Sequence, residues 1–135
     1  MANANLAPYG VAAEQVLEKL GMLTALRSKW VQGENIAQTY QFVATQNAAL
    51  GFVAKSQVWR QGGLKSGSAW FVPTEFHSPI KQDAVILRAT KNLDMAEQFM
   101  QCLQSNAVRQ KIEGFGYDTT EYRLQTRADN MDNKE

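Results

Sequence analysis

A glycine-led turn followed by an apolar helical pattern is the feature that most constrains the fold. Gly33 permits a tight turn. Asn35 is a strong N-cap, because its side-chain oxygen can accept an N–H of the first helical turn. The apolar residues that follow recur at helical spacing and are Ile36, Tyr40, Phe42 and Val43. Residues 50–54 then form an apolar run of strand length. This stretch therefore predicts a turn, a helix and a strand in that order.

The start of this helix is a candidate anion site, and the chain offers a second one. The first N–H groups of a helix and the positive end of its dipole both attract anions. Pro8 suits the first position of another helix, where its missing N–H is no loss, and Tyr9 follows it. No Lys or Arg lies in residues 1–18 or 30–54. An anion at these two helix starts would be held by amide dipoles rather than ion pairs.

Helical and strand patterns alternate along most of the chain. A helix is predicted from about residue 8 to residue 20, with Gly21 as its stop. Two more are predicted near the C-terminus, capped by Asp94 and Ser105. The predicted strands are residues 29–32, 50–54, 69–72 and 83–88, the last buried on both faces, and residues 61–68 are predicted to be a loop. The alternation favours an α/β fold.

Composition excludes several classes of function. The 135 residues carry 14 basic and 13 acidic side chains, a formal net charge of +1, which argues against a nucleic-acid partner. One cysteine and one histidine make a metal centre improbable, so neither a metal nor another cofactor is expected. Cys102 is predicted to be a small buried group. No apolar stretch is long enough to span a bilayer. With no nucleophile–base pair and no phosphate loop, we do not expect an enzyme.

The first residues bear on localisation. Residues 1–5 lack the basic start and apolar core of a signal peptide. If Met1 is the native start, a cytoplasmic protein is expected.

Several motifs together resemble the periplasmic molybdate-binding proteins of ABC transporters. They are Ala7-Pro8-Tyr9-Gly10-Val11-Ala12-Ala13, Gly33-Glu34-Asn35-Ile36-Ala37-Gln38, Leu50-Gly51-Phe52-Val53 and Glu113-Gly114-Phe115-Gly116-Tyr117. The resemblance covers about residues 4 to 117, in order. It implies the three-layer α/β lobe of a type II periplasmic-binding-protein-like fold, in which two lobes close on a tetrahedral oxyanion.

The resemblance also implies a ligand and its contacts. In that family molybdate or tungstate is bound by backbone N–H groups and hydroxyls. The second-lobe contacts fall on Tyr9 and, through its backbone N–H, on Ile36. Some members add a tyrosine hydroxyl where this chain has Ala54, so that contact is expected to be absent.

Relative to that family, the chain matches the second lobe and the C-terminal segment. We therefore expect a truncated fold with residues 1–82 as the second-lobe region, residues 83–124 as the segment that returns toward the first lobe, and residues 125–135 as a disordered tail. An ABC permease is expected as a partner only if the missing lobe is supplied. The full-length family is periplasmic.

Two hypotheses from different classes follow. The first is an oxyanion-binding lobe of the molybdate or tungstate type, weak or inactive by itself. The alternative is a ligand-free interaction protein derived from that lobe, in which the former interlobe surface or the surface left by the missing strands forms a homodimer. Under the alternative, Tyr9 and Ile36 lie at two ordinary helix starts.

Overall fold

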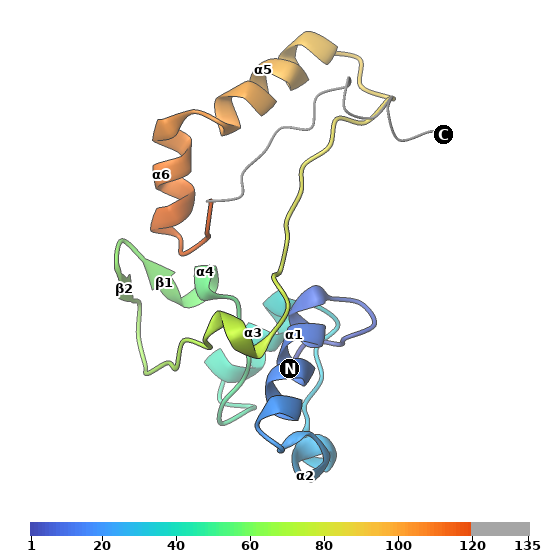
Figure 1. Ribbon diagram of the computed structural model, residues 1–135, viewed down its shortest axis with the longest axis vertical. Helices are drawn as coiled ribbons and strands as arrows, with labels where there is room; N and C mark the ends of the chain where they lie inside the picture. Colours follow the sequence, from blue (N-terminus) through green and yellow to red (C-terminus); the bar gives the residue numbers. More distant parts are fainter. Residues whose placement is uncertain (120–135) are drawn as a thin grey trace. The chain divides into compact units, whose positions relative to one another are not determined.

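The computed structural model describes residues 1–119, and the predicted C-terminal tail lies outside the described residues. The chain divides into two compact units, Met1–Ala84 and Val85–Glu135, which are described separately. Figure 1 shows α1 to α4 and the small sheet within the first unit, and α5 and α6 within the second.

Helix α1, Pro8–Lys19, supplies most of the core of the first unit. Pro8 occupies its first turn as predicted, and Gly21 has a φ of +67°, the left-handed conformation that ends a helix. The side chains that this helix buries are Ala12, Ala13, Val16 and Leu17. Two short helices, α2 (Leu23–Leu26) and η1 (Arg27–Lys29), then lead to residues 30–35.

Helix α3, Ile36–Ala44, begins where the sequence predicts and for the predicted reason. The Asn35 side-chain oxygen accepts the Gln38 N–H at 2.9 Å. In return, the Gln38 side-chain oxygen accepts the Glu34 N–H at 2.8 Å. Two backbone donors are thus satisfied reciprocally, in a variant of the capping box.

A short helix follows residue 54, and a hairpin occupies part of the predicted loop. Helix α4 covers Lys55–Val58, and strands β1 (Trp59–Arg60) and β2 (Gly63–Leu64) pair antiparallel. Gln61 and Gly62 between them have positive φ values, +50° and +86° respectively. Positive φ at both central residues is the signature of a two-residue hairpin turn whose twist matches its strands. The predicted loop at residues 61–68 is therefore wrong at Gly63–Leu64, which form β2.

The four predicted strands are wrong as regular strands. No regular strand occurs in the four predicted ranges, residues 29–32, 50–54, 69–72 and 83–88. The last range was also expected to be buried on both faces, with Val85 and Leu87 in it. These two side chains are 79% and 69% exposed. A strand forms only against a hydrogen-bonding neighbour, and within residues 1–119 the regular sheet has only β1 and β2. The apolar patterns are therefore present without the neighbours that would convert them into a sheet.

The second unit contains helices α5 (Leu93–Leu103) and α6 (Asn106–Gly114). Ser105 caps α6 as predicted, since its hydroxyl oxygen accepts the Val108 N–H at 3.4 Å. The predicted cap at Asp94 is wrong: Asn92 holds the N-cap position without a side-chain bond, and Asp94 lies in the first turn. Cys102 is exposed, so its predicted burial is also wrong.

Helix η2, Thr74–Phe76, completes the described elements. None of the helices within residues 1–119 has the length and apolar character needed to cross a bilayer.

The Asn35 cap can be tested against an uncapped asparagine in the same chain. Asn35→Ala should lower the free energy of unfolding by about 0.5–2 kcal/mol, because the first turn of α3 loses its acceptor. Asn92→Ala is the matched control, since Asn92 makes no capping bond, and it should change stability by less than about 0.5 kcal/mol. Urea unfolding followed by circular dichroism measures both. Equal losses in the two variants would contradict this account of the cap.

Candidate functional site

A parallel backbone pairing joins the segments that precede α1 and α3. Ala2 and Gly33 form a parallel bridge. The Asn3 N–H donates to the Gly33 carbonyl at 2.8 Å, and the Gly33 N–H donates to the Met1 carbonyl at 3.0 Å. The Met1 amine also donates to the Val31 carbonyl at 2.7 Å, and partial burial lowers the pKa of that amine.

The direction of this pairing is what makes the site. Each paired segment runs into a helix within a few residues, residues 1–3 into α1 and residues 31–33 into α3. Because the two segments are parallel, each leaves the pairing at its carboxyl end, and these two ends lie on the same side. In α/β folds ligands bind at this carboxyl edge, where the helix N-termini gather. Tyr9 lies in the first turn of α1 and Ile36 is the first residue of α3, so the two predicted contact residues belong to the two helices that begin there.

Gly10 allows α1 to approach the paired backbone closely. A Cβ added to Gly10 would lie 2.5 Å from the Ala2 oxygen, 2.6 Å from the Ala4 nitrogen and 2.7 Å from the Asn3 carbonyl carbon. All three atoms belong to the backbone, which cannot move aside as a flexible side chain could. A side chain at this position would therefore separate the start of α1 from the segment beneath it.

Gly33 has the equivalent role at the start of α3. A Cβ there would lie 2.8 Å from the Thr39 hydroxyl oxygen and 3.0 Å from the Thr39 nitrogen. Thr39 is itself buried, and its hydroxyl donates to the Asn35 carbonyl at 3.0 Å. The turn is thus packed against the first turns of its own helix.

Gln57 is a residue of this region that the sequence analysis missed. Its side-chain oxygen accepts the Ala54 N–H at 2.9 Å, while its side-chain nitrogen donates to the Ile36 carbonyl at 3.0 Å. One amide thereby ties the start of α4 to the first residue of α3. The sequence feature that could have indicated this role is the position of Gln57, three residues after the N-cap Ala54, where Gln and Glu complete capping boxes.

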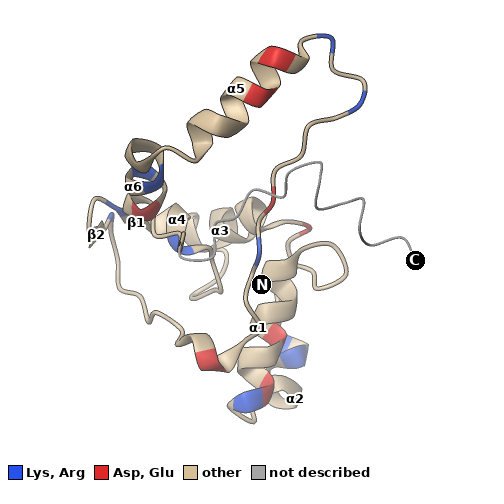
Figure 2. Ribbon diagram, turned by 45° about the horizontal axis from the view of Figure 1, so that its top comes forward, with Lys and Arg blue, Asp and Glu red and all other residues tan. Residues whose placement is uncertain are grey.

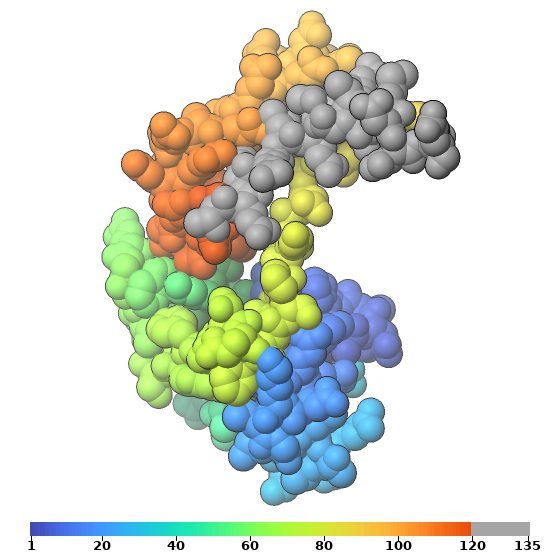
Figure 3. All heavy atoms as spheres, in the orientation of Figure 1, coloured from blue at the N-terminus to red at the C-terminus, as the bar shows by residue number. Residues whose placement is uncertain are grey.

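Tyr9 is held through its side chain. Its ring is half-buried, and its hydroxyl oxygen accepts the Gln82 side-chain N–H at 2.9 Å. Figure 3 shows the yellow-green segment that contains Gln82 lying against the blue α1.

The charge around the two helix starts agrees with the sequence prediction. Helix α3 and the first turn of α1 contain no Lys, Arg, Asp or Glu, and Figure 2 accordingly draws them in tan. The helix-start amides are therefore the only positive groups that these two stretches offer to an anion. Within residues 1–119, no cluster of three or more His, Cys, Asp or Glu side chains could hold a metal ion.

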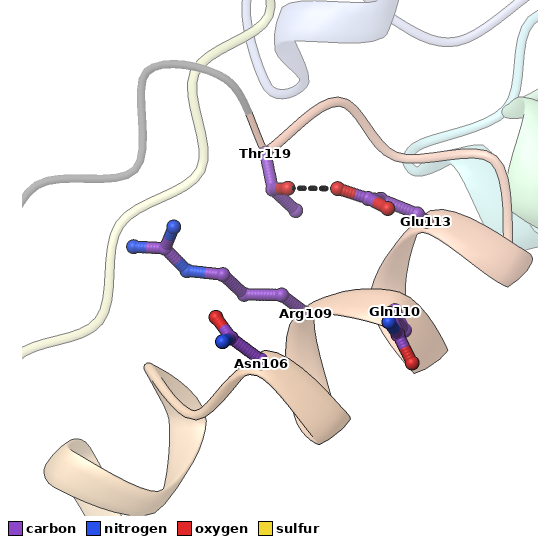
Figure 4. Close-up of a pocket in the computed structure, with 5 residues that line it drawn as sticks. All are labelled: Asn106, Arg109, Gln110, Glu113 and Thr119. Atoms are coloured by element: carbon purple, nitrogen blue, oxygen red, sulfur yellow. Dashed lines mark hydrogen bonds between the residues drawn. The ribbon is translucent and has the colours of Figure 1, made fainter.

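The hollows of the surface lie elsewhere. One of about 450 Å³ is lined by residues 3–5 with Glu14, Arg27, Trp30 and Gln32. Another of about 370 Å³ lies beside α6 in the second unit, where the Thr119 hydroxyl donates to the Glu113 carboxylate (Figure 4). Each is lined by both a carboxylate and a guanidinium, and neither includes Tyr9 or Ile36.

Comparison with known proteins identifies the family. Residues 1–118 match the family of bacterial extracellular solute-binding proteins. The chain belongs to this family. It is 50% identical over 117 residues to the molybdate-binding protein ModA of Azotobacter vinelandii, covering 87% of this chain and 46% of the relative. It is 42% identical over 119 residues to ModA of Rhodobacter capsulatus, covering 88% and 46%.

A more distant relative and a solved structure also match the chain. The putative ABC transporter substrate-binding lipoprotein YvgL of Bacillus subtilis is 28% identical over 113 residues, covering 82% of this chain and 42% of the relative. The solved periplasmic molybdate-binding protein of Azotobacter vinelandii matches with a TM-score of 0.83 at 36% identity, covering 87% of this chain and 52% of that one. This match confirms the predicted α/β fold of the periplasmic-binding type. The chain spans about half the length of these relatives.

The close approach at Gly10 can be tested with two helical glycines. Gly10→Ala should destabilise the first unit by about 1–3 kcal/mol, because the added Cβ overlaps backbone atoms. Gly114 lies in α6 with nothing within 4 Å of an added Cβ. Gly114→Ala should therefore be neutral or stabilising by up to about 1 kcal/mol. Urea unfolding of both variants provides the measurement, and a Gly10→Ala protein as stable as the unmodified chain would refute the packing argument.

Proposed function

We propose that this chain binds a tetrahedral oxyanion of the molybdate or tungstate type, with Tyr9 and Ile36 as contact residues. The observation that carries the proposal is the parallel pairing of residues 1–3 with residues 31–33, which sends two helix starts to one edge. Identity of 50% and 42% to proteins named molybdate-binding supports this choice of ligand class.

The physical basis of binding is hydrogen bonding to uncharged donors. The first N–H groups of a helix have no partner within that helix, and the Ile36 N–H is the first of α3. Anions accept such bonds, and each charge-assisted bond is stronger than a neutral one. Contacts from one edge leave the opposite side of the anion in water. We therefore propose that the affinity of this chain alone is weak compared with that of a protein that encloses its ligand.

The same proposal implies that the chain is a solute-binding protein, and it implies which partners the chain has. The chain acts as a binding protein rather than as an enzyme, in agreement with a family of solute-binding proteins. An ABC permease is its partner when the remaining half of the fold is supplied, and the site of action is then the periplasm, the compartment of the solved relative. Neither nucleic acid nor a membrane is a partner in this proposal, since the formal net charge is +1.

Proline substitution at Ile36 isolates the backbone contact. Ile36→Pro deletes one N–H at the first helical position, where proline is well tolerated. The preceding residue, Asn35, already has the extended conformation that proline requires, with φ −145° and ψ 172°. Ile36→Ala is the matched control, because it shortens the same side chain and keeps the N–H. We expect Ile36→Pro to weaken molybdate binding roughly tenfold or more relative to Ile36→Ala.

Isothermal titration with molybdate, tungstate and sulfate measures these affinities, and circular dichroism verifies that both variants are folded. Equal affinities of Ile36→Pro and Ile36→Ala would exclude the Ile36 N–H as a contact. Absence of binding heat from the unmodified protein in millimolar molybdate would exclude the proposed function.

The second candidate is a homodimer without a ligand, and exposed apolar side chains favour it. In the second unit Val85 is 79%, Leu87 69%, Met95 66% and Phe99 62% exposed. Met95 and Phe99 are four residues apart on α5 and therefore share one face. Apolar surface of this kind is usually covered in solution, and a second copy of the chain is the proposed cover.

Solution mass tests the dimer. Light scattering after size exclusion at micromolar concentration should give twice the chain mass of 15.1 kDa. Phe99→Glu should return the mass to that of a monomer, because it places a charge in the apolar contact. Glu97→Gln, which changes an exposed charge on the same helix, is the control and should leave the dimer intact. A monomer mass for the unmodified chain would reject this candidate.

A further inference from the structure

Three side-chain contacts attach residues 75–82 to α1 in a regular order. The Lys19 ammonium donates to the Glu75 carbonyl near the end of the helix. In the middle, the Ser78 N–H donates to the Gln15 side-chain oxygen at 2.8 Å, and the Gln15 side-chain nitrogen donates to the Ser78 hydroxyl at 3.3 Å. At the start of the helix, the Gln82 side-chain nitrogen donates to the Tyr9 hydroxyl oxygen at 2.9 Å. The segment therefore runs antiparallel to α1 and reaches the helix start at Gln82.

The last of these contacts differs from the others in its position. Tyr9 is the predicted oxyanion contact, whereas Gln15 and Lys19 lie further along α1, away from the candidate site. Gln82 also stands two residues before Ala84, where the first unit ends. The residue that holds the Tyr9 ring is thus carried by the segment that leads out of this unit.

The chemistry of the bond gives it a direction. The Gln82 amide donates and the phenol oxygen accepts, so the Tyr9 hydroxyl hydrogen must be directed away from Gln82. A helix start whose first turn is fixed in this way before the ligand arrives loses less conformational entropy when the anion binds.

We propose that Gln82 is a positioning residue for the oxyanion contact at Tyr9. It holds the ring and the first turn of α1 in the geometry that receives the anion, and it contacts Tyr9 rather than the anion. This inference rests on the proposed function and adds a residue whose role no sequence motif indicated.

The test compares two glutamines that attach the same segment to the same helix. Gln82→Leu removes the donor to Tyr9, and Gln15→Leu removes the neighbouring attachment without affecting the Tyr9 bond. Tyr9→Phe removes the acceptor, and the double variant Tyr9→Phe with Gln82→Leu completes a cycle. Molybdate titration calorimetry gives the affinities, and amide NMR spectra without ligand report the geometry of the helix start.

The expected result has three parts. Gln82→Leu weakens molybdate binding by roughly two- to tenfold, while Gln15→Leu leaves the affinity unchanged. The double variant binds no more weakly than Tyr9→Phe alone. In the ligand-free protein, Gln82→Leu shifts the Tyr9 and Gly10 amide signals, and Gln15→Leu shifts the Ser78 amide instead.

Each contrary result overturns a defined statement. Equal affinity losses in Gln82→Leu and Gln15→Leu, additive losses in the double variant, or unmoved Tyr9 signals in Gln82→Leu would overturn the positioning role while leaving oxyanion binding intact. An unmodified protein that gives no heat with molybdate would overturn the proposed function, and this inference with it.

Discussion

The structure of the first unit depends on one short parallel pairing and on the two glycines that let helices begin beside it. Ala2 pairs with Gly33, and α1 can approach this pairing because Gly10 has no side chain. The pairing gives the two segments one direction, and the absence of side chains at Gly10 and Gly33 lets a helix begin close to each of them. An edge at which two helices begin is the physical consequence.

Glutamine amides hold the segments around these helix starts. Gln38 and Gln57 satisfy backbone groups at the start of α3 and α4. Gln82 reaches the Tyr9 hydroxyl from a distant segment. Because an amide offers both a donor and an acceptor without net charge, it can order a helix start without adding a charge to it.

The local features of the fold could be predicted because their causes are local. Pro8 at the start of α1, Asn35 as the cap of α3 and Ser105 as the cap of α6 each act within one helical turn. The family resemblance likewise rests on short motifs, and the matches over 87–88% of the chain agree with it. Asp94 was mistaken for a cap because two neighbouring residues, Asn92 and Asp94, have suitable side chains and only backbone conformation distinguishes them.

The sequence by itself determined where α1, α3 and α6 begin, the absence of Lys and Arg around the first two of those starts, and the apolar runs within residues 50–54 and 83–88. Whether such runs become strands was decided by tertiary structure, since a strand needs a partner for its N–H and C=O groups. Tertiary structure also decided which groups Gln57 and Gln82 bond to. Each bonds to a residue more than twenty positions away, and no pattern within a helix or a strand records which distant chain will lie beside it.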